Sequence, residues 1–173
     1  MRCKMNSALG FDMETIKRDE QYMELALDEA RRAFEKQEIP VGALVVHGGE
    51  VLASAHNQPI AMNDPSAHAE VLVMRRAAEK TGNYRLNGAT VYVTLEPCIM
   101  CVGMMIHARI SRLVFGAYDG KSGAVASVLR LLDEERMNHR IDFSGGILQG
   151  PCGEILSRFF REKRISSPPA SAA

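Results

Sequence analysis

Two short motifs contain residues that could bind a metal ion and move a proton. His68 and Glu70 stand two residues apart in His-Ala-Glu, and Cys98 and Cys101 stand three apart in Pro-Cys-Ile-Met-Cys. Cysteines at this spacing share one face of a helix, and the positive end of the helix favours their thiolate forms. One histidine nitrogen and two cysteine sulfurs suit Zn²⁺, and three protein ligands leave a fourth position for water. The motifs therefore predict a catalytic zinc site.

Glu70 is predicted to be the proton carrier of this site. Zinc lowers the pKa of a bound water toward about 7, and a nearby carboxylate that is not a ligand can accept the proton and pass it on. Glu70 lies two residues after the proposed histidine ligand, His68. The pattern thus favours hydrolytic chemistry with Glu70 as the catalytic acid and base.

Other interpretations of the single motifs remain open at this point. A Cys-x-x-Cys pair is also typical of thioredoxin-like redox proteins, although the residues after Cys101 do not support that class. A structural zinc site would need a fourth protein ligand, for which the candidates are His56, His107 and Cys152. The composite pattern, His-x-Glu about 30 residues before Pro-Cys-x-x-Cys, is the signature of zinc nucleobase deaminases and favours the catalytic site.

The surrounding sequence predicts a layered α/β domain that places both motifs at helix starts. A hairpin is expected around Gly48-Gly49, because a glycine pair separates two apolar, β-branched runs. The strands after it alternate with helices, which favours a mixed sheet. We expect helices at about 19–37, 67–80, 98–107, 125–135 and 152–164, and strands at 41–46, 51–53, 90–95, 113–115 and either 141–143 or 147–148.

Length and composition limit the classes of protein that the chain could form. Its 173 residues fit one domain, with 46% hydrophobic and 24% charged residues. The 21 basic residues balance the 21 acidic residues, and no stretch approaches the length of a membrane span. The first residues lack the apolar run of a secretory signal, so a cytoplasmic protein is expected. We expect a flexible arm at 1–17, the catalytic domain at 18–165 and a disordered tail at 166–173.

The chain also resembles a known family, the bacterial tRNA-specific adenosine deaminases, which convert the wobble adenosine of an anticodon to inosine. The resemblance runs from about Gln21 to Arg164 and lies outside the zinc motifs as well as in them. The segments that carry it are 39–43 (IPVGA), 57–60 (NQPI), 64–70 (DPSAHAE), 83–86 (NYRL), 92–98 (YVTLEPC), 105–107 (MIH), 114–117 (VFGA), 137–140 (MNHR) and 159–161 (FFR).

The resemblance implies a fold, an assembly and a set of substrate contacts. The fold would be the cytidine-deaminase-like three-layer α/β/α sandwich with a five-stranded mixed sheet. The enzyme would be a homodimer with one Zn²⁺ per subunit, acting on a tRNA anticodon stem-loop. The substrate contacts that it implies are Asn57 to the purine and Asp119 near the ribose; Ala69, Phe160 and Arg161 are further predicted substrate contacts. Tyr118 replaces an arginine that is frequent in the family, and His56 replaces a tryptophan of some relatives.

The predicted C-terminal helix carries a local positive charge that the balanced net charge conceals. Residues 158–164 contain four basic residues and Glu162, which gives 4 − 1 = +3 beside two phenylalanines. Helical periodicity places Phe159 in the core and leaves Phe160 more accessible. Basic side chains with an accessible aromatic ring are typical of RNA contacts, and a solvated basic helix end is the alternative.

Two further functions stay open from the sequence. A deaminase of a free base or nucleoside, such as guanine, cytosine or cytidine, would use the same zinc motifs. A non-catalytic, zinc-stabilised RNA-binding module would have a fourth protein ligand in place of water.

Overall fold

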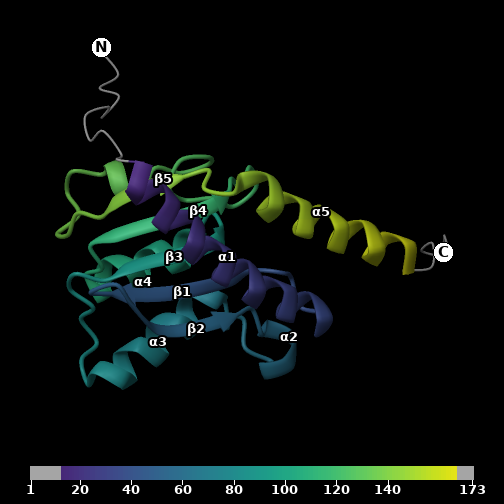
Figure 1. Ribbon diagram of the computed structural model, residues 1–173, viewed down its shortest axis with the longest axis horizontal. Coiled ribbons are helices and arrows are strands. Elements are labelled where there is room, and N and C mark those ends of the chain that lie inside the picture. The colour runs from purple at the N-terminus through teal and green to yellow at the C-terminus, as the bar shows by residue number, and fades with distance from the viewer. Residues whose placement is uncertain (1–12, 167–173) are drawn as a thin grey trace, which may run out of the picture.

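The computed structural model describes residues 13–166, which form one mixed sheet with helices on both faces (Figure 1). The sheet has five strands in the order β2-β1-β3-β4-β5. Its strands are β1 Gly42–His47, β2 Glu50–His56, β3 Thr90–Leu95, β4 Arg112–Ala117 and β5 Asp142–Gly145. The helices are α1 Met13–Glu35, α2 Pro59–Met62, α3 Ala69–Thr81, α4 Ile99–Ala108 and α5 Gln149–Ser166. The predicted three-layer α/β/α architecture is confirmed.

Alternation of side chains along the strands gives each face of the sheet its own core. Leu44, Tyr92 and Val114 pack with residues of α1 and α5 on one face. Val45, Val93 and their neighbours pack with α3 and α4 on the other face. The period of two along a strand explains why adjacent residues serve opposite cores. α5 begins beside β3 and β4 and then extends away from the sheet (Figure 1).

Strand direction places the starts of several connections at one edge of the sheet. β1 is antiparallel to both β2 and β3, so β2 and β3 run in the same direction. β4 is parallel to β3, and β5 is parallel to β4. The segments that follow β2, β3, β4 and β5 therefore all leave from the same edge. In open α/β sheets the carboxyl ends of parallel strands are where ligands bind.

The hairpin and the ends of the predicted helices follow their local sequence signals. Gly48 and Gly49 both have positive φ, at 59° and 85°, as a two-residue hairpin turn requires. Gly82 ends α3 in the left-handed conformation with φ 63°, as predicted. The hairpin, the strand at 90–95 and the helices that carry the two zinc motifs are confirmed.

Several sequence-based expectations need correction. α1 begins at Met13, so residues 13–17 of the expected arm are helical, and residues 1–12 lie outside the described part of the chain. The tail expected at 166–173 likewise lies outside it, except for Ser166 in α5. β5 lies at the first of its two expected positions. The short helix α2 was not predicted.

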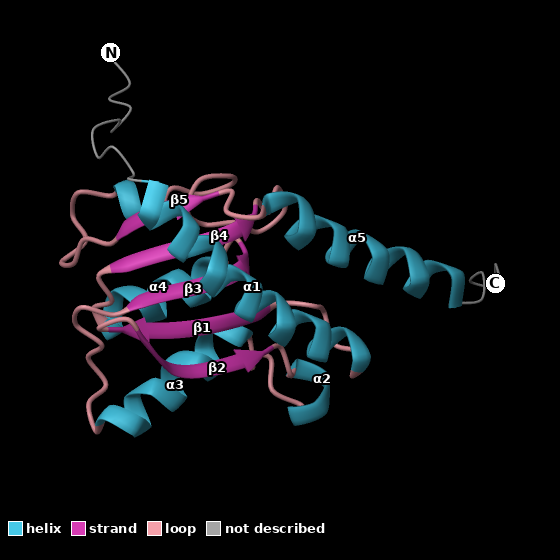
Figure 2. Cartoon of the chain, viewed as in Figure 1, coloured by secondary structure: helices cyan, strands magenta, loops and turns pink. Residues whose placement is uncertain are grey.

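The helix expected at 125–135 is absent from the structure. This segment belongs to the long connection between β4 and β5, drawn as a loop in Figure 2, and contains only a short 3-10 turn at Leu131–Asp133. The N–H groups of Val125, Ala126 and Ser127 all donate to one oxygen of Glu96. Three successive amides that converge on one point require a tight turn, and this contact with a distant residue overrides the local helical pattern. No helix of the described residues is long and apolar enough to cross a membrane.

A buried ion pair joins the first helix to the sheet. Asp19 is 1% exposed and accepts two hydrogen bonds from the Arg112 guanidinium, at 2.8 and 2.6 Å. The Tyr92 hydroxyl donates to the same carboxylate at 2.8 Å, and burial together with this bond raises the pKa of Tyr92. The pair therefore fixes α1 over β3 and β4.

We expect Asp19→Ala to lower the free energy of unfolding by about 3 kcal/mol, because it removes one partner of a buried, hydrogen-bonded pair. Asp28→Ala is the matched control: Asp28 lies on the same helix in an exposed pair with Arg31, and its loss should cost no more than about 0.5 kcal/mol. Urea denaturation of both variants measures the difference. Equal losses would show that the buried pair is not a principal link between α1 and the sheet.

Candidate metal centre and catalytic pocket

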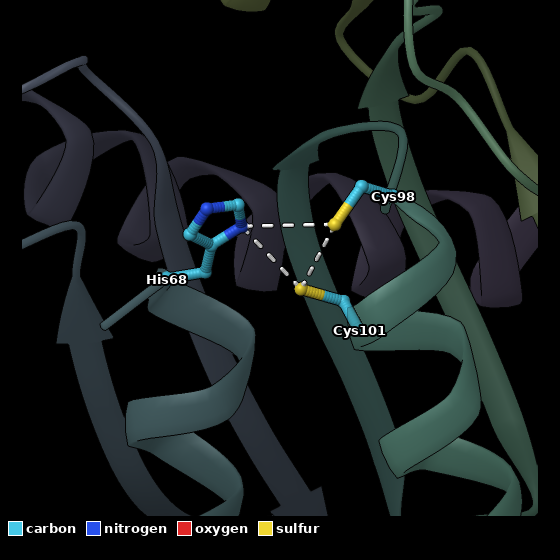
Figure 3. A group of neighbouring side chains, drawn as sticks. All are labelled: His68, Cys98 and Cys101. Carbon is cyan, nitrogen blue, oxygen red and sulfur yellow. Dashed lines mark hydrogen bonds between the residues drawn. The ribbon is translucent and has the colours of Figure 1, made fainter. Parts of the chain in front are cut away.

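The three predicted ligands lie at the starts of two neighbouring helices. His68 is the N-cap of α3, and Cys98 is the N-cap of α4, with Cys101 in the first turn of the same helix. Figure 3 shows the imidazole of His68 pointing across the gap between the helices toward both sulfurs. In chain order α3 comes after β2 and α2, and α4 comes directly after β3. β2 and β3 end at the same edge of the sheet, which brings together two motifs that are 30 residues apart in sequence.

The distances between the ligand atoms fit a tetrahedral zinc ion. His68 Nδ1 lies 3.8 Å from Cys98 Sγ and 3.6 Å from Cys101 Sγ, and the two sulfurs are 3.7 Å apart. Tetrahedral angles with Zn–S of about 2.3 Å and Zn–N of about 2.0 Å require separations of about 3.8 Å between sulfurs and about 3.5 Å between sulfur and nitrogen. The donor set and its spacing therefore match Zn²⁺ with one coordination position left over.

No fourth protein ligand joins this cluster among residues 13–166. His56 pairs with Glu29 through Nδ1 at 2.7 Å, and its Nε2 accepts from Lys36 at 3.2 Å. His107 is exposed on α4, and Cys152 is buried in the core on the opposite face of the sheet. The three residues proposed for a closed, structural zinc site are thus engaged or placed elsewhere.

The electrostatics of the cluster favour a thiolate at Cys98. The hydrogen bond between Cys98 and Cys101, with a further contribution from His68, lowers the pKa of Cys98 to about 4. The same sulfur–sulfur bond and burial raise the pKa of Cys101. The hydrogen bond with Cys98 raises the pKa of His68. Zinc ligands bind in their deprotonated forms, so metal binding would displace the protons that these groups hold.

Glu70 is buried beside the ligands in the first turn of α3. Its side chain is close to Cys101, and the residue is 4% exposed. Burial raises the pKa of Glu70 above the ordinary glutamate value, because burial disfavours the charged form. A carboxyl group with a raised pKa at the floor of a pocket suits transfer of a proton in both directions.

A cavity of about 760 Å³ opens over the cluster. Its wall includes His68, Glu70 and Cys98 together with the predicted substrate contacts Asn57, Asp119 and Phe160. The predicted contacts Ala69 and Arg161 do not line it: Ala69 is buried behind the wall, and Arg161 is exposed on α5. Phe159 is buried and Phe160 is 44% exposed, as the helical periodicity predicts.

Asn57 and Ala69 are linked to each other in the structure. The backbone N–H of Ala69 donates to Asn57 Oδ1 at 2.8 Å, so Asn57 satisfies an amide of the first turn of α3. Within the described part of the chain, the side-chain nitrogen of Asn57 has no hydrogen-bond partner, and the residue faces the pocket. The amide group is therefore held through its oxygen while its N–H donors are free to meet a ligand.

Asp119 turns its own loop as well as lining the pocket. Its carboxylate accepts hydrogen bonds from the N–H groups of Lys121 and Ser122 and from the Ser122 hydroxyl. These bonds form an Asx turn, which is typical of an aspartate that directly precedes a glycine. The turn aims the loop toward the cavity, whose wall it completes with Gly120 and Tyr118.

Two buried glutamates at the pocket were not singled out from the sequence. Glu38 accepts the N–H groups of Ile60 and Ala61, at 3.3 and 2.7 Å, and so fixes α2 at the pocket rim. Glu96 lines the pocket and binds the loop opposite. For Glu96 the sequence offers a signal, a charged residue directly after the apolar strand β3, because a buried charge there requires partners; Glu38 lies between α1 and β1 and has no such signal.

Comparison with known proteins assigns the chain to a family. The family model of MafB19-like deaminases matches residues 17–164. The tRNA-specific adenosine deaminase of Bacillus subtilis is 48% identical over 146 residues, covering 84% of this chain and 91% of that protein. The enzyme of the same name from Agrobacterium fabrum is 48% identical over 144 residues, or 83% and 95% of the two chains. This chain belongs to the tRNA-specific adenosine deaminase family.

Solved structures support the same assignment at the level of the fold. A structure from a study of A-to-I editing by tRNA:A34 deaminases matches this deaminase with a TM-score of 0.77 and 46% identity, over 79% of this chain and 99% of that chain. A guanine deaminase from Nitrosomonas europaea has a TM-score of 0.71 at 21% identity, over 91% and 98% of the two chains. The second likeness shows a shared fold alone. The cluster of His68, Cys98 and Cys101 is the zinc site of this deaminase.

We expect Cys98→Ala to lose bound zinc, because it removes one of three protein ligands from an open site. Cys152→Ala is the matched control, since Cys152 is a buried thiol on the opposite face of the sheet, and this variant should keep one zinc per chain. Elemental analysis of the purified variants gives the zinc content. Full zinc content in Cys98→Ala would contradict the proposed ligand set.

Proposed function

We propose that this deaminase converts the wobble adenosine of a tRNA anticodon loop to inosine by hydrolysis. The observation that carries the proposal is the three-ligand zinc geometry with Glu70 buried beside it in an open pocket. The identity of 44–48% to tRNA-specific adenosine deaminases over most of the chain supports adenosine in tRNA as the substrate. A base in a loop is also less costly to extrude than a base in a duplex.

Glu70 carries the proton of the reaction in this proposal. When bound, zinc supplies a Lewis acid that makes water acidic enough to react near neutral pH. Glu70 accepts the proton that water loses and delivers it to ring nitrogen N1 as the water oxygen bonds to C6. Glu70 then moves the proton of the C6 hydroxyl to the amino group, the C6–N bond breaks and ammonia leaves, so adenosine and water give inosine and ammonia. Burial raises the pKa of Glu70, which makes its carboxylate a stronger base toward the water proton.

Asn57 and Asp119 are proposed to orient the nucleoside in the pocket. Asn57 is fixed through its oxygen by the Ala69 amide, which leaves its N–H groups to donate to an acceptor on the purine edge. Asp119 lies on the opposite loop, and its carboxylate is suited to accept from a ribose 2′-hydroxyl, which would favour RNA over DNA. Ala69 acts through its amide, which holds Asn57 in place.

The C-terminal helix is proposed to contact the RNA outside the pocket. Phe160 lines the cavity and is 44% exposed, so its ring is available for stacking on a base. Arg158 lies over the Phe34 ring of α1 at 4.4 Å and so helps to fix α5 to α1, whereas Lys163 lies over the Phe159 ring of its own helix at 5.5 Å. Arg161 is exposed on this helix and is proposed to contact phosphate.

The assembly and the compartment are proposals that follow from the same substrate. A group of exposed apolar side chains supports a homodimer. They lie on the first turn of α4 and on the loop that Gly123 joins to it, and they are Ile99, Met100, Val128 and Leu129.

The tRNA substrate and cysteine ligands that must stay reduced support a cytoplasmic location. Residues 18–165 are proposed as the catalytic domain, which agrees closely with the family match at 17–164.

The test compares an anticodon stem-loop that has adenosine at the wobble position with free adenosine, guanine, cytosine and cytidine. We expect inosine and ammonia from the stem-loop alone. Glu70→Gln should keep the zinc content and lower kcat by about 10³-fold or more, because the variant has no group to carry the proton. Preferential turnover of a free base would instead assign this deaminase to small substrates. Full activity of Glu70→Gln would refute the mechanism.

A further inference from the structure

Glu96 makes an unusual number of hydrogen bonds for one side chain. It directly follows β3, is 2% exposed and precedes the Pro97-Cys98 turn. Oε1 accepts the N–H groups of Val125, Ala126 and Ser127 at 3.1, 2.7 and 3.0 Å. Oε2 accepts the N–H of Asp119 at 3.1 Å and the hydroxyl of Ser127. One carboxylate therefore closes both ends of the segment 119–127, called the 119–127 loop below.

Backbone contacts fasten the same loop to the turn that carries a zinc ligand. Cys98 and Gly123 form an isolated antiparallel bridge, and the N–H of Ala124 donates to the carbonyl of Pro97 at 2.9 Å. A β-carbon at Gly123 would collide with the Glu96 carboxylate, so only glycine permits this approach. The loop thus rests on the metal-binding turn with the Glu96 side chain between them.

The 119–127 loop forms one wall of the pocket. Residues 119–122 line the cavity next to Tyr118, and Asn57 and Pro59 line the same cavity. Because Glu96 bonds both ends of the loop, the position of this wall relative to Cys98 depends on the Glu96 carboxylate. A loop that carries substrate contacts must be held this firmly if its contacts are to be in place before the substrate arrives.

We propose that Glu96 is a positioning residue for deamination, which holds the 119–127 loop against the zinc-binding turn so that the substrate side of the pocket is formed in advance. The proposal rests on the proposed function for its kinetic consequences. Its structural part, the dependence of the loop on Glu96, can be measured without any substrate.

Glu96→Gln is a sharp probe because it keeps the shape of the side chain. Glutamine replaces one accepting oxygen with an NH₂ group, which only donates. In one orientation this group faces three backbone N–H groups, and in the other it faces the Asp119 N–H and the Ser127 hydroxyl. Either orientation sets donor against donor. Ser127→Ala is a milder second variant, since it removes one hydroxyl donor and leaves the carboxylate.

Hydrogen exchange of the zinc-loaded, full-length protein tests the structural part. In Glu96→Gln we expect the amides of residues 125–127 to exchange at least 10-fold faster than in the unsubstituted protein, with amides of the central strand β3 and the zinc content unchanged. Ser127→Ala should show a smaller increase in the same segment. It also carries the test if Glu96→Gln does not fold. Unchanged exchange at 125–127 in the folded variant would overturn the proposal.

Kinetics on the anticodon stem-loop separate positioning from stability. We expect KM to rise about 10-fold in Glu96→Gln and about threefold in Ser127→Ala, with kcat changed by less in each case, because the loop contacts substrate before the chemical step. Asp19→Ala is the control: it weakens the fold at the opposite face and should leave KM unchanged below its unfolding temperature.

An equal rise of KM in Asp19→Ala, or an unchanged KM in both loop variants, would assign Glu96 to stability alone and overturn the proposal. If the unsubstituted enzyme does not deaminate the stem-loop, the proposed function fails, and the exchange comparison still decides the role of Glu96.

Discussion

The structure depends on the convergence of two helix starts at one edge of the sheet. A zinc ion accepts ligands only within a few tenths of an ångström of their proper distances, yet its ligands here come from α3 and α4, which follow different strands. The parallel direction of β2 and β3 brings these starts together, and packing of both helices on the same face of the sheet fixes their separation. The resulting separations of 3.6–3.8 Å between ligand atoms are those of a tetrahedral site.

Buried carboxylates then hold the irregular segments around this centre. Glu38 fixes α2, Glu96 fixes the 119–127 loop, and Glu29 bonds His56 next to Asn57. Lys36 donates to the other ring nitrogen of His56, so the proton of a neutral His56 lies on Nδ1, toward Glu29. Within residues 13–166, every buried side-chain nitrogen and oxygen has a hydrogen-bond partner. The loops that form the pocket wall have no regular backbone hydrogen bonds of their own. The buried carboxylates accept hydrogen bonds from the backbone N–H groups of these loops instead.

Much of this arrangement is predictable from the sequence, for reasons that differ between residues. The strand at 90–95 and the hairpin follow from alternation and a glycine pair, which are local signals. The zinc ligands follow from spacing, because Cys98 and Cys101 must share a helical face. The helix predicted at 125–135 is wrong because of a contact that is distant in sequence. Glu96, about 30 residues away, accepts hydrogen bonds from the backbone N–H groups of this segment, and no local pattern encodes that contact. The pairing of Asn57 with the Ala69 amide is equally a product of the tertiary fold.

The central claim is that the zinc of this deaminase has three protein ligands and one exchangeable position. X-ray absorption at the zinc edge of the purified protein measures this coordination directly. We predict two sulfur neighbours at about 2.3 Å and two nitrogen or oxygen neighbours at about 2.0–2.1 Å, one of which is displaced when a small anion such as cyanide is added. A third sulfur, or a shell that no added ligand changes, would show a closed structural site and contradict the account.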